Sequence, residues 1–149
     1  MNISEEVEKI YPFLVSTRRY LHEHPESSLK EYETSKFIKQ ELDKINIDYV
    51  TVGETGVLAE IKGKNAGKTI FLRADMDALE MNDAKDADYK SKNQGLNHAC
   101  GHDAHTAALL GATKILATYP AHSEKFDIDE EALKIACQFH INVALEYLK

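Results

Sequence analysis

The sequence predicts an α/β fold, or the related α+β arrangement, in a chain of 149 residues. Apolar residues recur at helical spacing near both ends of the chain. Three short runs in the middle are rich in β-branched and aromatic residues, as strands are. Asp75 and Asp77 follow the third run, at the position where open α/β sheets usually bind ligands. We therefore expect a central sheet flanked by helices, with a polar site at one edge of the sheet.

Two amphipathic helices are predicted before the sheet. The first has Ser4 as its N-cap and ends before Pro25, because the residue preceding a proline disfavours helical geometry. Pro12 lies inside this segment and is expected to kink or restart the helix. The second helix is expected over residues 31–45, where one face carries a stripe of apolar side chains.

The three β-rich runs are Ile47–Val52, Gly56–Ile61 and Thr69–Leu72. Residues 62–68 separate the last two runs and read as a polar hairpin loop that contains glycine. The stretch from Glu80 to Ala99 is polar and has no clear period. A loop of that length in a compact domain is usually functional or disordered.

Two further helices are predicted in the last third of the chain. One begins near Asp103 and ends near Tyr119, and the other has Asp129 as its N-cap. Three or four strands form a sheet that is small compared with the four helices expected to cover it. We therefore expect the sheet to be incomplete.

Bulk properties exclude some classes of partner and leave others open. The formal net charge of −7 argues against nucleic acid and against an anionic membrane surface, since both attract basic proteins. No apolar run is long enough to span a bilayer, and the first residues do not read as a signal peptide. Two cysteines are too few for a disulfide framework, which favours a reducing cytoplasm.

Cys100 and His102 are the strongest candidates for a metal site. They lie two residues apart, between the long loop and a predicted helix N-terminus. Thiolate and imidazole are good ligands for zinc, cobalt or manganese, and a helix N-terminus favours the thiolate form. The alternatives are an inert buried cysteine beside a capping Asp103, and a cysteine nucleophile with a nearby histidine base.

Other polar residues surround this pair in the sequence. His98 and His105 lie within one turn of it, so histidines, a cysteine and the two aspartates are expected to converge. Asp77 could orient a metal-bound imidazole by a hydrogen bond, or simply cap a loop. His22 and His24, at the end of the first helix, are expected to face solvent or to cap that helix.

At this point the motifs resemble a known family, the metal-dependent amidohydrolases that include hippurate hydrolase, N-acyl-amino acid amidohydrolases and the plant auxin-conjugate hydrolases. The resemblance runs almost unbroken from Arg18 to Tyr119. Four segments carry it in order: Arg18–Glu26, Thr55–Val57, Leu72–Leu79 and His98–Thr106.

The resemblance implies roles for four residues. Cys100 and His102 correspond to ligands of a site that binds two divalent ions, such as zinc, manganese or cobalt. His122 corresponds to the C-terminal histidine that completes the site, and Asp77 to the aspartate that supports the metals. The implied reaction is hydrolysis of the amide bond of N-acyl amino acids or other small peptide-like substrates.

The resemblance also implies an abridged catalytic domain over residues 1–149. Residues 1–119 resemble the N-terminal part of the family and residues 122–149 its extreme C-terminal end. The intervening family segment carries a paired-glutamate motif with the general base, a further metal-binding histidine and a lid domain that often mediates dimerisation, and it has no counterpart here. Two other interpretations remain open: an inactive metal-binding remnant or interaction module, and an engineered or mis-joined deletion product.

Overall fold

The computed structural model describes residues 2–62 and 69–118. It confirms the α/β class, with three helices and one two-stranded antiparallel sheet among the described residues. The elements in chain order are α1 (Ile3–Glu23), α2 (Tyr32–Asp43), β1 (Tyr49–Val52), β2 (Gly56–Ala59) and α3 (His102–Thr118).

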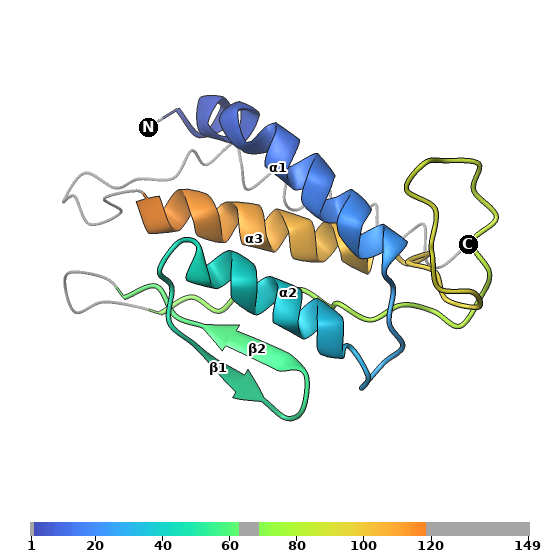
Figure 1. Ribbon diagram of the computed structural model, residues 1–149. Helices are drawn as coiled ribbons and strands as arrows, with labels where there is room; N and C mark the ends of the chain where they lie inside the picture. The colour runs from blue at the N-terminus through green and yellow to red at the C-terminus, as the bar shows by residue number, and fades with distance from the viewer. Residues whose placement is uncertain (1, 63–68, 119–149) are drawn as a thin grey trace.

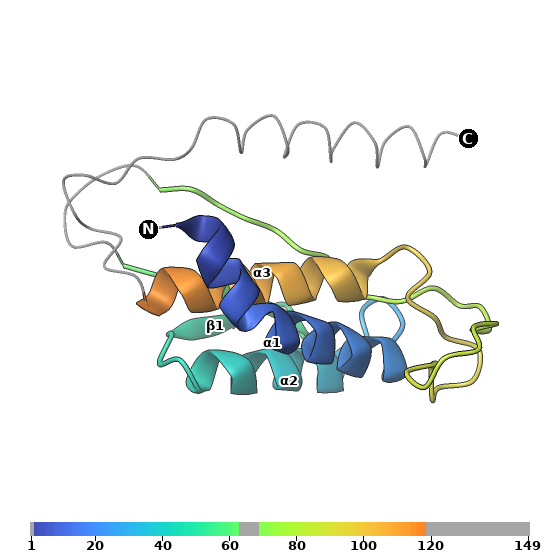
Figure 2. The same ribbon diagram turned by 90° about the horizontal axis from the view of Figure 1, so that it is seen from above.

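Helix α3 lies at the centre of the described structure (Figure 1). It packs against α1 on one side and α2 on the other, and α2 also contacts strand β2 of the hairpin. In the view from above, an extended segment that begins at residue 69 runs alongside α3 (Figure 2). Thr106 of α3 donates a hydrogen bond to the backbone oxygen of Asp75 at 3.0 Å, which ties this segment to the helix.

Helix α1 is longer and more continuous than the sequence predicts. Asn2 is its N-cap and Ser4 lies inside the first turn, so the predicted cap is wrong by two residues. The helix also continues through Pro12 without restarting. Pro12 is exposed, so the backbone carbonyl that loses its partner there can bind water, while packing against α3 stabilises the helix.

Gly111 allows α1 and α3 to approach closely. A Cβ atom placed on Gly111 would come within 2.3 Å of Leu14 Cδ2 and 3.1 Å of Ile10 Cδ1. We expect Gly111→Leu to destabilise the fold by about 1–3 kcal/mol, the usual cost of inserting carbon atoms into a packed interface.

Urea unfolding followed by circular dichroism measures this change, with Ala108→Leu on the exposed face of the same helix as the matched control. Equal stability of the Gly111 and Ala108 variants would contradict a close helix crossing at Gly111.

The sheet contains fewer strands than expected. Its hairpin pairs Tyr49 with Ala59 and Val52 with Gly56. The predicted strand at Thr69–Leu72 is wrong, because that run is extended but pairs with no strand in the described ranges. Ile70 and Phe71 are 80% and 73% exposed. Their β-rich composition is typical of buried strands, but composition alone does not provide a partner strand.

The described core is small and lies between the helices. Leu21 and Leu42 are each only 2% exposed, and they are joined by Ala78, Ala107 and Leu110. No helix in residues 2–62 or 69–118 is long and apolar enough to cross a membrane. The helix predicted after Asp129 lies outside the described residues, as does His122.

Candidate metal centre

The long polar stretch after the extended segment returns the chain to the end of α1. Leu79 and Asn97 pair with each other by two backbone hydrogen bonds of 3.0 Å. The backbone N–H of Lys92 donates to the carbonyl oxygen of Glu23 at 2.8 Å, and the Asn93 side chain donates to that of Pro25 at 2.8 Å. The predicted functional loop is therefore anchored at α1, and it delivers the chain to the N-terminus of α3.

A tight turn sets the start of α3. Gly101 has a φ of 84°, in the left-handed region that glycine adopts without a steric cost. Its carbonyl oxygen accepts the N–H groups of Ala104 and His105 at 3.0 and 3.1 Å. The turn leaves Cys100 exposed just before the helix and makes His102 the first helical residue.

His102 contacts Asp77, the residue that the sequence analysis proposed as a hydrogen-bond partner of a ligand imidazole. Its Nδ1 lies 2.9 Å from Asp77 Oδ1 and 3.0 Å from the Asp77 backbone oxygen. Both are acceptors, so Nδ1 carries the proton and donates, which leaves Nε2 with a free lone pair. Metal-binding histidines are commonly held in this way by a carboxylate or a carbonyl.

The donor atoms fit part of a divalent-metal site. An exposed thiol at a helix N-terminus and an imidazole Nε2 lone pair are both ligands that zinc accepts. Residues 2–62 and 69–118 hold no group of three or more histidine, cysteine or acidic side chains arranged to bind a metal. Cys100 and His102 therefore supply at most half of such a site, and the predicted ligand His122 lies beyond the described residues.

His98 is buried beside this turn and differs chemically from His102. It is 3% exposed, and within the described part of the chain neither ring nitrogen has a hydrogen-bond partner. Burial lowers the pKa of His98 to about 4, so the ring is neutral near pH 7. The sequence placed His98 near the site, and the structure brings it there without making it part of a ligand group.

His22 is the functional candidate that sequence reasoning assigned wrongly. It was expected to face solvent or to cap α1, but its side chain is 0% exposed. Nδ1 lies 2.7 Å from Asp103 Oδ2, and Nε2 lies 3.1 Å from Asp83 Oδ2. His22 follows the buried Leu21 and lies one turn after Arg18, so the helical phase was the available signal.

Two cations and several backbone groups complete this buried cluster. Arg18 Nε lies 2.8 Å from Asp103 Oδ2, and Lys85 Nζ lies 3.1 Å from His22 Nε2. The Ser91 N–H donates to Asp83 and is the main cause of the lowered pKa of that carboxyl group, about 2. Asp83 is therefore ionised at neutral pH and accepts hydrogen bonds throughout the physiological range.

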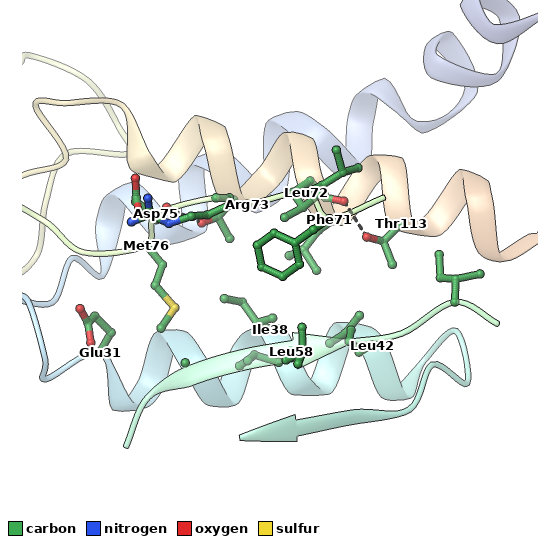
Figure 3. Close-up of a pocket in the computed structure, with 18 of the residues that line it drawn as sticks. Glu31, Ile38, Leu42, Leu58, Phe71, Leu72, Arg73, Asp75, Met76 and Thr113 are labelled. Atoms are coloured by element: carbon green, nitrogen blue, oxygen red, sulfur yellow. Dashed lines mark hydrogen bonds and ion pairs between the residues drawn. The ribbon is translucent and has the colours of Figure 1, made fainter. Parts of the chain in front are cut away.

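An open groove of about 840 Å³ lies between α2, β2, the extended segment and α3 (Figure 3). The ring of Phe71 and the thioether of Met76 project into it from the extended segment, opposite Ile38 and Leu58. Asp75 and Asp77 also line the groove, so one part of it adjoins the His102 side chain. The groove is mostly apolar, with carboxylates at the part nearest the candidate metal ligands.

Several known proteins are similar to this chain in sequence and in fold. Residues 71–138 match Peptidase family M20/M25/M40. The chain is 45% identical over 116 residues to thermostable carboxypeptidase 2 of Saccharolobus solfataricus, covering 76% of this chain and 30% of that protein. The crystal structure of the Bacillus subtilis YxeP protein, a dinuclear metal binding peptidase from the M20 family, superposes with a TM-score of 0.71 at 43% identity. This chain is thus similar in sequence and in fold to proteins of the M20 peptidase family.

The shared part is a limited portion of each M20 relative. The alignment with YxeP covers 74% of this chain and 32% of the YxeP chain. A third relative, the N-acetyl-L-cysteine deacetylase of Bacillus subtilis, is 49% identical over 104 residues, which cover 69% of this chain and 25% of the deacetylase. The chain thus spans about a third or less of the length of the M20 proteins it matches.

Proposed function

We propose that this chain carries part of the metal centre of an M20 amidohydrolase, and that the complete centre hydrolyses the amide bond of N-acyl amino acids or similar small amides. One observation carries the proposal: the contact of His102 Nδ1 with Asp77 Oδ1, beside Cys100 at the N-terminus of α3. This arrangement leaves the exposed Cys100 thiol and the His102 Nε2 atom available at the same helix end. The names of the relatives, a carboxypeptidase and an N-acetyl-L-cysteine deacetylase, support an amide or peptide substrate.

The roles follow from the groups in this chain. Cys100 and His102 would hold divalent metal, with His122 as a further ligand, and Asp77 would orient the His102 ring. Two divalent ions such as zinc, manganese or cobalt would polarise the amide carbonyl and lower the pKa of an attacking water. The groove that adjoins Asp77 offers apolar walls for the acyl group of a substrate.

We further propose that residues 1–119 and 122–149 correspond to the two ends of an M20 catalytic domain whose middle segment, with its general-base glutamate and remaining ligands, is missing. General acid–base catalysis typically contributes about 10²–10⁴-fold to rate, so turnover by this chain alone is expected to be weak. The low cysteine content favours the reducing cytoplasm as its compartment.

A metal-binding module without turnover is the second candidate. It is favoured by the lack of any three-residue ligand group within the two described ranges. The open apolar groove adds to it, because exposed apolar surface of this kind promotes association with another protein surface. The two candidates share metal binding through Cys100 and His102 and differ in hydrolysis.

Amino acid release from a panel of N-acetyl and N-benzoyl amino acids separates these candidates. The full chain is assayed with added zinc, manganese or cobalt, next to His102→Ala and to His105→Ala as a matched histidine control. Slow metal-dependent turnover that disappears only in His102→Ala supports the hydrolase.

If folded wild-type protein binds cobalt through Cys100 but releases no amino acid above the His102→Ala background, the metal-binding module is correct. If the protein binds neither cobalt nor zinc, both candidates are wrong.

A further inference from the structure

The buried cluster around His22 includes Asp103, the residue that follows the candidate metal ligand His102. His22 and Asp103 are 81 positions apart in sequence, yet their side chains meet at 2.7 Å with 0% and 1% exposure. Asp103 follows His102 in the first turn of α3, and its Oδ1 accepts the N–H of Ala104 at 2.9 Å. One carboxylate therefore joins the end of α1 to the beginning of α3.

We propose that His22 is a positioning residue for the metal centre: through Asp103 it fixes the first turn of α3, and so the direction in which His102 and Cys100 present their donor atoms. The inference rests on the proposed function for its metal-binding part. It concerns residues of α1 that do not themselves reach the metal ligands.

The two nitrogens of His22 face different groups. Asp103 Oδ2 lies 2.8 Å from Arg18 Nε and 2.7 Å from His22 Nδ1, so the Asp103 carboxylate accepts from both and His22 Nδ1 is the donor. Nε2 instead lies near Asp83 Oδ2 at 3.1 Å and Lys85 Nζ at 3.1 Å, both from the long loop. Nδ1 of His22 therefore contacts α3, whereas Nε2 contacts two residues of the long loop.

The consequence for the ligands follows from helix geometry. Asp103 and His102 are consecutive in the first turn of α3. A rotation of that turn therefore moves both side chains together. His102 can donate to Asp77 at 2.9 Å only in one rotational setting of that turn. Because Asp103 is buried, its contact with His22 exchanges little with water and holds this setting firmly.

Two conservative replacements of His22 separate the Nδ1 role from general support of the fold. The side-chain amide nitrogen of asparagine occupies a position close to that of histidine Nδ1, whereas that of glutamine lies close to Nε2. His22→Asn therefore retains a donor to Asp103, and His22→Gln moves the donor toward Asp83. His24→Gln is the control, since His24 is a neighbouring histidine whose Nδ1 contacts the Tyr20 carbonyl oxygen.

Cobalt titration of the full-length variants, followed by the thiolate-to-cobalt absorption band, gives the first readout. We expect His22→Gln to weaken cobalt binding by roughly 10–100-fold, the usual effect of losing a residue that orients ligands. His22→Asn and His24→Gln are expected to bind cobalt as tightly as the wild type. All measurements are made below the unfolding transition of the least stable variant.

Hydrogen exchange gives a second readout that needs no metal. In His22→Gln the amides of Ala104 and His105 should exchange roughly 10-fold faster or more, while amides in the later turns of α3 keep their protection. Equal cobalt affinity and equal exchange in His22→Gln and His22→Asn would overturn the positioning role.

The outcomes distinguish this inference from the proposed function. If the wild type binds no cobalt, the proposed function fails and exchange at Ala104 and His105 alone decides whether His22 fixes the turn. If the wild type binds cobalt but both His22 variants bind it equally well, the inference fails and the proposed function stands.

Discussion

Asp103→Ala is expected to reduce the free energy of unfolding by about 3–5 kcal/mol, the range observed when one partner of a buried charged cluster is removed. Asp103 is 1% exposed and contacts the Arg18 Nε at 2.8 Å and the His22 Nδ1 at 2.7 Å. Its loss leaves the half-buried Arg18 guanidinium and the buried His22 Nδ1 donor without their acceptor. It also removes an acidic group from the first turn of α3, where the helix dipole stabilises negative charge.

Urea unfolding of Asp103→Ala and of Asp48→Ala, which changes an exposed aspartate, provides the measurement and its control. Domains of this size have only about 5–15 kcal/mol of stability, so Asp103→Ala should be partly unfolded at 37 °C. Asp103→Asn keeps the side-chain volume and one acceptor oxygen. Its loss of stability should therefore lie between those of Asp103→Ala and Asp48→Ala. A loss below about 1 kcal/mol in Asp103→Ala, comparable to a surface substitution, would show that the cluster does not stabilise the fold.

Asp77→Asn is expected to lower the affinity of the chain for cobalt or zinc by roughly 10–100-fold while leaving its stability nearly unchanged. Asp77 is half-buried and its Oδ1 is 2.9 Å from His102 Nδ1. An asparagine oxygen can still accept that hydrogen bond, but it carries no charge to make the His102 ring a stronger ligand. The amide can also flip and present its N–H₂ group to Nδ1, which turns Nε2 away from the metal or protonates it.

Metal affinity measured by competition with a chromophoric chelator tests this prediction. Asp75→Asn is the matched control, because Asp75 lies two residues away in the same extended segment and forms an ion pair with Arg73 instead. Equal weakening in both variants would mean that the overall negative charge of the segment matters, rather than the Asp77–His102 contact. An unchanged affinity in Asp77→Asn would refute the orienting role.

The helices could be predicted because their signals are local. The apolar period of α1 and α2 and the stop before Pro25 depend on residues within a few turns, and the observed bounds differ from the predicted ones by one or two residues at most ends. At Pro12 the predicted restart of the helix is wrong for the opposite reason. Whether a proline interrupts a helix depends on what packs against it, and here α3 supports α1 across that position.

The strand predicted at Thr69–Leu72 shows the limit of composition. Ile70 and Phe71 have the side chains of a buried strand, but a strand also needs a neighbour that accepts its backbone hydrogen bonds. No such neighbour lies in the described ranges, and both side chains are largely exposed. A run of apolar residues indicates that its burial is favourable, but it does not indicate which other segment of the chain covers it.

Some residues of the candidate site could be predicted from the sequence and others could not. Cys100, His102 and Asp77 could be nominated because each belongs to a short, specific motif. The His22 cluster could not, because it joins α1, the long loop and α3, and the motif segments that contain His22 and Asp103 do not show that these two side chains meet. A histidine near the end of a helix and next to Glu23 looks like a surface residue until the distant aspartates Asp83 and Asp103 that contact it are located.

The contact between His22 and Asp103 also sets an order of events during synthesis. Ribosomes add about 5–20 residues per second, so an interval of 81 residues keeps α1 waiting for about 4–16 s before its partner exists. Through that time the face of α1 that carries Leu21 has no α3 to cover it. The first turn of α3 therefore gains its contact with His22 only after α3 has been synthesised and has docked against α1.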